Sequence, residues 1–176
     1  MTHTQQILQN KTFIQPRKLA NKHGELQYQW PIKDFDRLAG LLYSNEGIIK
    51  VKLTGKYDDR QRCLVEAHIT ANIQLECQTT FEAIDYQIDN TVLYCTVISE
   101  EQITELDDEY EALFIEDGQV DIKEVIEDEL ILSIPVVANK ASEELGIKMS
   151  YGNIPEQTEE EKNPFLVLQN LKLEND

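Results

Sequence analysis

Apolar and polar residues alternate with a period of two through the middle of the chain. Residues 48–57 place apolar side chains on one side and three lysines on the other: Lys50, Lys52 and Lys56. After a turn at residues 58–60, the alternation continues over residues 62–76, with Cys, Val, Ala, Ile and Leu facing one way. Alternation of this length is typical of antiparallel strands that have one buried and one hydrated face.

A third apolar segment, residues 81–98, completes a three-stranded meander, although Asp89 and Asn90 mark a point where this strand can break. Two further strands are expected at residues 25–31 and 109–116. A short extended piece is expected at residues 13–20, and residues 99–108 form an acidic connection.

Helical spacing predicts helices at residues 34–43, 121–132 and 163–173, the first with Asp34 or Asp36 as its N-cap. The fold class is therefore α+β. We expect one domain over residues 1–176, with a mostly antiparallel sheet of about five or six strands packed by a few helices, including a C-terminal helix.

The helix at residues 121–132 carries the strongest local signals. Asp121 is placed to cap it, with Glu124 three residues later as the capping-box carboxylate. Apolar residues recur at positions 122, 125, 126 and 130 and form one stripe. Pro135 ends the helix, because its ring lacks an amide donor and biases the preceding residue away from helical geometry.

Three consecutive carboxylates lie in this helix: Glu127, Asp128 and Glu129. Adjacent helical residues are turned by about 100°, so Glu129 falls near the apolar stripe while Asp128 points away. A carboxylate at the edge of a buried face needs a partner or water.

The end of the chain reads as an acidic linker at residues 155–162 that leads to a docking helix at residues 163–173. Asn163 is its N-cap and Pro164 its first helical residue, where proline is preorganised. Phe165 begins an apolar face, which packs on the same domain or on a partner protein.

Charge is distributed unevenly around a net value of −17. Residues 1–76 hold 11 Lys and Arg against 8 Asp and Glu, whereas residues 77–176 hold 5 against 25. This polarity indicates an acidic half that meets cationic partners and a mildly basic half that tolerates RNA; alternatively, the acidic surface confers solubility alone.

The start of the chain, MTHTQQILQN, lacks the apolar core of a signal peptide, and no apolar run approaches the roughly 20 residues that span a membrane. Cys63, Cys77 and Cys95 form no close pair, which fits free thiols in a reducing compartment. We therefore expect a cytoplasmic protein.

The sequence contains no constellation that argues for catalysis. The seven glycines form no phosphate-binding loop, and the three histidines lack metal or triad spacing. We expect no enzyme activity, no cofactor and no bound metal.

The stretch DEYEALFIEDGQVDIKEVIEDELILSIPVV closely resembles the YceD family, the bacterial large ribosomal RNA subunit accumulation proteins. FIQPRKLA, IQLECQ and KNPFLVLQNLK agree as well, so the resemblance covers nearly the whole chain. It implies structural roles for Cys77, Asp121, Pro135, Asn163, Pro164 and Phe165.

This resemblance implies a non-enzymatic bacterial factor that promotes accumulation, processing or assembly of large-subunit ribosomal RNA. The alternative is an acidic adaptor or chaperone that holds a basic ribosomal protein without contacting RNA. The expected partners are precursor large-subunit ribosomal RNA or a basic large-subunit ribosomal protein, with no membrane and no small-molecule substrate.

Family members often carry Cys-x-Arg-Cys where this chain has Cys77-Gln78-Thr79-Thr80. Only the first cysteine is retained, so a paired-thiol metal site or disulfide cannot operate within the motif. A lone thiolate ligates metal poorly. Cys77 is therefore interpreted as a small residue that continues the apolar face of the preceding strand.

Two sets of residues are candidates for binding. A phosphate-contacting strip is predicted on the hydrated side of the meander, at Lys50, Lys52, Lys56, Arg60, Arg62 and His68; the same residues also fit an ordinary hydrated face. A partner-docking point is predicted at Glu127, Asp128 and Glu129. These three carboxylates also fit a solvated helix end, or a structural pairing with Arg37 or Arg17.

Overall fold

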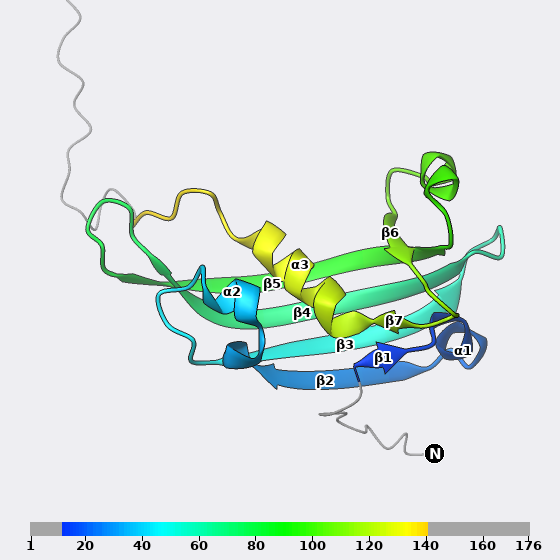
Figure 1. Ribbon diagram of the computed structural model, residues 1–176, viewed down its shortest axis with the longest axis horizontal. Helices are drawn as coiled ribbons and strands as arrows, with labels where there is room; N and C mark the ends of the chain where they lie inside the picture. Colours follow the sequence, from blue (N-terminus) through cyan, green and yellow to red (C-terminus); the bar gives the residue numbers. More distant parts are fainter. Residues whose placement is uncertain (1–11, 141–176) are drawn as a thin grey trace, which may run out of the picture. The chain divides into compact units, whose positions relative to one another are not determined.

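A computed structural model describes residues 12–140 and shows a curved sheet with helices on one face (Figure 1). The elements follow in the order β1 (Phe13–Ile14), α1 (Pro16–Asn21), β2 (Glu25–Pro31), the 3-10 helix η1 (Ile32–Asp34), α2 (Asp36–Ala39), β3 (Ile48–Tyr57), β4 (Cys63–Glu76), β5 (Ala83–Val97), the 3-10 helix η2 (Glu100–Glu105), β6 (Glu111–Phe114), β7 (Val120–Asp121) and α3 (Ile122–Ser133). The linker at residues 155–162 and the helix with Asn163, Pro164 and Phe165 lie outside the described residues.

The main sheet has five strands in the order β2-β3-β4-β5-β6. Strands β2 to β5 are antiparallel neighbours, and β6 pairs with β5 in parallel. Strands β1 and β7 form a separate antiparallel pair. The α+β class and the mostly antiparallel sheet are confirmed, and so is the meander.

The predicted alternation determines which face of the sheet is covered. Odd-numbered residues of β3 and β4 form most of the core beneath the helices, and Ile49, Leu53, Val65 and Ile69 are fully buried. The opposite face stays open, because the even positions between Lys50 and Glu76 are mostly polar and half-buried or exposed.

The break expected in the third strand at Asp89 and Asn90 is wrong, because β5 runs unbroken from Ala83 to Val97. Asn90 pairs with Ile69, so it lies on the covered face between apolar neighbours. Its side-chain amide donates a hydrogen bond to Glu129 of α3, with Nδ2 and Oε1 2.7 Å apart. The polar residue is therefore a contact between sheet and helix and not a strand end.

Helix α3 forms close to its predicted bounds, although Glu124 makes no capping-box hydrogen bond within the described residues. Asp121 is its N-cap, with a carboxylate oxygen 3.0 Å from the Lys123 amide, and the helix ends at Ser133, two residues before Pro135. Ile122, Ile126 and Leu130 are fully buried against the sheet. The apolar stripe therefore attaches α3 to the sheet.

The extended piece expected at residues 13–20 is limited to β1, and a helix follows it. Pro16 begins α1, where its fixed φ suits the first helical position and its missing amide costs nothing. Helix α1 packs very closely on β3. A Cβ added to Gly55 would come within 2.5 Å of the Ala20 amide nitrogen.

The helix expected at residues 34–43 is shorter, and its expected caps are wrong. Helix α2 spans one turn, Phe35 is its N-cap residue, and neither Asp34 nor Asp36 caps it. Phe35 and Leu38 enter the core, whereas Leu41 is 55% exposed. Apolar contact therefore ends after one turn. In the described part of the chain, no helix is long and apolar enough to cross a membrane.

Candidate binding surfaces

The predicted phosphate-contacting strip lies on the open face of the sheet. Lys50, Lys52 and Lys56 project from β3, and His68 projects from β4 opposite Lys52. All four side chains reach solvent at least in part. The structure therefore brings together the sheet residues of this strip.

Most of these side chains already have acidic partners. Lys52 Nζ lies 2.8 Å from Glu25 Oε1, and Lys56 Nζ lies 2.5 Å from Glu66 Oε2. His68 Nε2 lies 2.8 Å from Asp89 Oδ1. Lys50 alone of the three lysines makes no ion pair within residues 12–140. A phosphate would therefore compete with neighbouring carboxylates for most of the strip.

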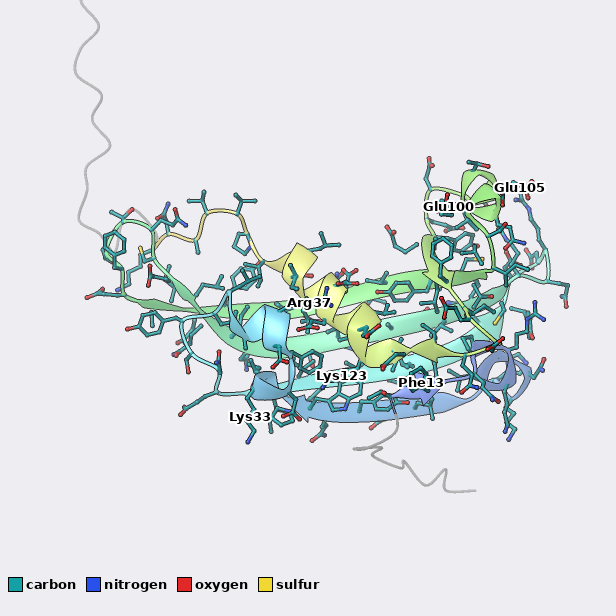
Figure 2. All side chains as sticks on the ribbon, in the orientation of Figure 1. Phe13, Lys33, Arg37, Glu100, Glu105 and Lys123 are labelled. Carbon is teal, nitrogen blue, oxygen red and sulfur yellow. The ribbon has the colours of Figure 1, made fainter. Side chains whose placement is uncertain are left out.

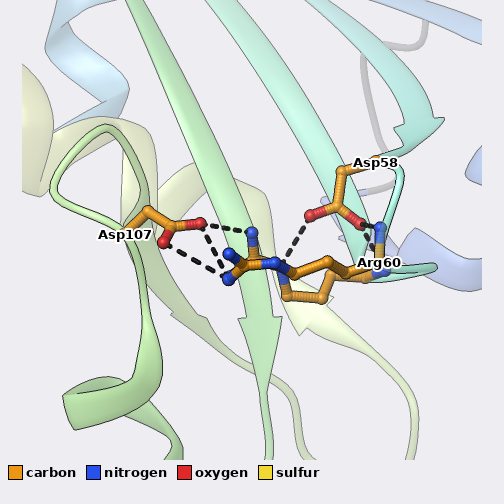
Figure 3. Close-up of polar contacts among 4 residues, drawn as sticks. Asp58, Arg60 and Asp107 are labelled. Carbon is orange, nitrogen blue, oxygen red and sulfur yellow. Dashed lines mark hydrogen bonds and ion pairs between the residues drawn. The ribbon is translucent and has the colours of Figure 1, made fainter.

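Arg60 and Arg62 lie at the β3–β4 turn, beyond the lysines, where they hold Asp107 (Figure 3). Arg62 bridges two carboxylates: its Nε lies 2.6 Å from Asp58, and its Nη2 lies 2.6 Å from Asp107. The guanidinium also stacks over Tyr110 at 4.7 Å from the ring centroid. Hydrogen bonds from Arg62 lower the pKa of Asp107. These arginines fasten the segment before β6 to the turn.

Arg37, which Figure 2 labels beside α3, pairs with two members of the carboxylate triplet, Glu127 and Asp128. Glu127 Oε1 accepts hydrogen bonds from the amides of Arg37 at 2.9 Å and Leu38 at 3.1 Å. Its Oε2 lies 3.0 Å from Arg37 Nη2. Burial alone would raise the pKa of Glu127, but these donors outweigh burial and lower it. Of the two pairings expected for the triplet, the one with Arg37 is present.

Asp128 also reaches Arg37, with Oδ1 2.6 Å from Nη1, yet its side chain stays 61% exposed. Glu129 points toward the sheet, as expected, and accepts from Asn90. Burial raises the pKa of Glu129, and the nearby carboxylate of Glu111 on β6 raises it further. The three neighbours therefore play different parts: Glu127 anchors α2, Asp128 faces solvent, and Glu129 lines a groove.

We expect Glu129→Gln to stabilise the protein at neutral pH by about 0.5 to 1 kcal/mol. Glutamine keeps an acceptor for Asn90 and removes the repulsion from Glu111. Because folding raises the pKa of Glu129, its ionisation costs stability progressively as the pH rises from the unfolded to the folded pKa, and the gain should vanish below about pH 4. Urea unfolding against pH measures this, with Glu100→Gln on η2 as control; equal gains in both variants would contradict it.

A groove of about 800 Å³ opens between β6 and α3. Its β6 side carries Glu111, Glu116 and Asp117, and its α3 side carries Asp121, Glu124, Asp128 and Glu129. None of the described residues that line it is Lys, Arg or His. Lys123, the nearest cation in sequence, instead lies 5.0 Å from the centroid of the Phe35 ring. We call this surface the acidic groove.

Sequence reasoning missed the acidic groove. It singled out residues 127–129 as three neighbours, whereas the groove gathers carboxylates from β6, β7 and α3. The available signal was the absence of Lys and Arg between Arg62 and Lys123, which leaves residues 63–122 without a side-chain cation other than histidine.

Cys77 is buried at the end of β4, as expected for a small residue that continues the apolar face. The nearby Thr80 hydroxyl and backbone amides lower the pKa of Cys77 to about 7, against the effect of burial. Thr79 Oγ1 donates to Asn139 Oδ1 at 3.1 Å and so links the β4–β5 turn to the segment after α3. All three cysteines are free thiols, and no group of side chains within residues 12–140 is arranged to hold a metal ion.

Within the described residues, these features define a two-layer α+β protein with one sheet face that no helix covers and an acidic groove beside α3. The chain belongs to the YceD family, since the model of that family, "Large ribosomal RNA subunit accumulation protein YceD", matches residues 65–172. A relative of that name from Haemophilus influenzae is 28% identical over 163 residues, which cover 90% of this chain and 94% of the relative. No solved structure matches the chain.

Proposed function

We propose that this protein promotes the accumulation of large-subunit ribosomal RNA in the bacterial cytoplasm, as a binding factor and not as an enzyme. Membership of the YceD family is the observation that carries this proposal. The family is named for ribosomal RNA accumulation and not for a catalysed reaction.

Two modes of action fit this role: docking of a basic ribosomal protein, or direct contact with precursor RNA. The distribution of ion pairs favours docking. On the open sheet face, Lys52, Lys56 and His68 already lie beside carboxylates. In the acidic groove, by contrast, Glu111 and Glu124 make no salt bridge within the described residues. Negative charge without a local counterion attracts a cationic partner.

Sedimentation of a cell lysate tests the role and the mode together. We expect the protein to migrate with large-subunit precursors, and its loss from the cell to lower the level of large-subunit ribosomal RNA relative to small-subunit RNA. If the protein docks on a ribosomal protein, its migration with the large-subunit precursor should survive treatment with RNase. An unchanged ratio of the two RNAs after depletion would refute the proposed role.

Direct RNA contact remains the second candidate, because Lys50 is exposed without an ion pair in residues 12–140 and no described helix covers its face. The test is the triple variant Lys50→Gln, Lys52→Gln and Lys56→Gln. Under the docking mode we expect it to leave the salt dependence of any RNA binding unchanged.

The matched control replaces three exposed lysines outside this face, Lys18, Lys22 and Lys33, by glutamine. Filter binding of a precursor RNA fragment is measured over a range of salt concentrations for both triple variants. Loss of three phosphate contacts would flatten the slope of log K against log salt by roughly two to three units. Flattening in the sheet-face variant alone would establish direct RNA contact and overturn the preference for docking.

A further inference from the structure

The acidic groove combines charge with exposed apolar surface. Phe13, Phe114 and Leu132 line it and are 54%, 47% and 80% exposed. Large apolar side chains that reach solvent beside carboxylates suit the side chains of arginine and lysine, whose stems are aliphatic and whose ends are cationic. The groove is therefore suited to a peptide that carries such residues.

The shape of the groove favours an extended occupant. Strand β6 is the last strand of the sheet, and its outer edge pairs with no described strand. All four residues of β6, Glu111 to Phe114, line the groove. Successive side chains of a strand point to opposite faces, so a groove lined by four consecutive residues also meets the backbone of the strand. An exposed edge binds extended peptides through backbone hydrogen bonds.

Much of the charge in the groove is uncompensated within residues 12–140, although Asp128 pairs with Arg37. Glu111, Glu116, Asp117 and Glu124 make no salt bridge there, and Glu111 faces Glu129 closely enough to raise its pKa beyond the effect of burial. Tyr94, which lines the groove at its base, has a pKa raised first by burial and then by Glu129 and Glu111. A cation between β6 and α3 would relieve this repulsion.

We propose that the acidic groove binds an extended, Lys- and Arg-rich segment of a protein partner along the edge of β6. This inference rests on the proposed function and specifies the site and chemistry of its partner. Cations at alternate positions of the segment face the carboxylates of β6 and α3, and the residues between them contact Phe114 and Leu132.

The charge of other candidates argues against them as occupants. An RNA strand would bring phosphates to a groove lined by seven carboxylates and no described cation. Residues 141–176 of the chain hold 8 Asp and Glu against 3 Lys and Arg, and residues 1–11 hold a single Lys. Neither end of the chain supplies a row of cations, so a separate basic protein is the matching occupant.

Peptide binding to the full 176-residue chain tests this proposal. The probe is a fluorescein-labelled octapeptide in which Arg or Lys alternates with Val, and fluorescence anisotropy gives its dissociation constant near physiological salt. We expect the double variant Glu111→Gln and Glu124→Gln to bind the probe at least tenfold more weakly, because it removes one carboxylate from each side of the groove.

The matched control is Glu100→Gln with Glu105→Gln on η2 (Figure 2), which removes the same charge outside the groove. We expect this control to weaken binding less than about threefold, since exposed and distant charges are screened. Thermal melts of both variants establish that each is folded. Equal weakening by the two variants, or none by the groove variant, would overturn the proposal.

A second peptide tests the extended conformation. Replacing its valines by prolines keeps the charge but removes alternate backbone donors, so we expect binding to weaken at least tenfold. If the proline-containing peptide bound equally well, binding of an extended peptide along the edge of β6 would be refuted. In cells, if the groove variant fails to bind the probe but restores large-subunit ribosomal RNA, this inference fails while the proposed function stands. If depletion leaves the ribosomal RNA unchanged, the proposed function fails.

Discussion

Replacing Glu127 by alanine is expected to destabilise the folded protein by about 2 to 3 kcal/mol, because several hydrogen bonds to one charged group are lost together. The carboxylate accepts from the amides of Arg37 and Leu38 and from the Arg37 side chain, and only 12% of the Glu127 side chain is exposed. Alanine would leave the two amides at the start of α2 without this acceptor. Urea unfolding followed by circular dichroism gives the change in free energy.

Asp128→Ala is the matched control, since it removes an adjacent carboxylate that contacts Arg37 but stays 61% exposed. We expect it to cost less than about 1 kcal/mol. Because folding lowers the pKa of Glu127, its contribution is present above the unfolded value and is lost as the pH falls through the folded value. The difference between wild type and Glu127→Ala should therefore shrink in acid. Equal effects of the two variants would contradict the anchoring role.

Replacing Gly55 by alanine is expected to cost about 3 kcal/mol through overpacking. The added Cβ would lie 2.5 Å from the Ala20 nitrogen and 2.6 Å from the Leu19 carbonyl carbon, both of which are backbone atoms of α1. A flexible side chain could move aside, whereas α1 must shift as a unit and lose its contact with β3. Thermal unfolding measures the loss.

Gly40→Ala is the control for this substitution. A Cβ at Gly40 meets only carbonyl oxygens at 3.6 and 3.8 Å, and its φ of −69° suits any residue. We expect a change within about 0.5 kcal/mol of zero. If Gly55→Ala changed stability as little as Gly40→Ala, this result would contradict the close packing of α1 on β3.

The sequence predicts the strands and α3 well because each depends on contacts that repeat at a fixed spacing. The alternation from Ile49 to Leu75 survives in the sheet, and the stripe at Ile122, Ile126 and Leu130 faces the core. Local chemistry placed the cap at Asp121 and the stop before Pro135. Where the same residues satisfy both local preferences and packing against the core, the sequence pattern is sufficient to predict the element.

The sequence-based predictions are wrong where a contact between residues distant in sequence determines the local structure. Asn90 interrupts an apolar pattern, and only the presence of Glu129 explains it as part of a continuous strand. The length of α2 depends on how many of its turns meet the core, and the helix start at Pro16 depends on the space above Gly55. None of these contacts lies within a short window of sequence.

Candidate binding sites were harder to predict for the same reason. The lysines of β3 were correctly placed on the hydrated face, but their pairing with Glu25 and Glu66 follows from the register of three strands. Likewise, the triplet at residues 127–129 appears uniform in sequence, although one member holds α2 and another lines the acidic groove. Composition indicated negative charge in this half of the chain, and the fold concentrates it at β6 and α3.

The position of α3 at the end of the described chain has a consequence during synthesis. Strands β2 to β5 follow one another and pair with their neighbours in sequence, so the meander can form once Val97 has emerged from the ribosome. Helix α3, which buries Ile126 and Leu130 against that sheet, is complete only at Ser133. A nascent chain therefore carries a folded sheet with part of its apolar face uncovered, and the same helix that protects this face also completes the acidic groove. The described part of the fold and the proposed binding groove are thus completed together.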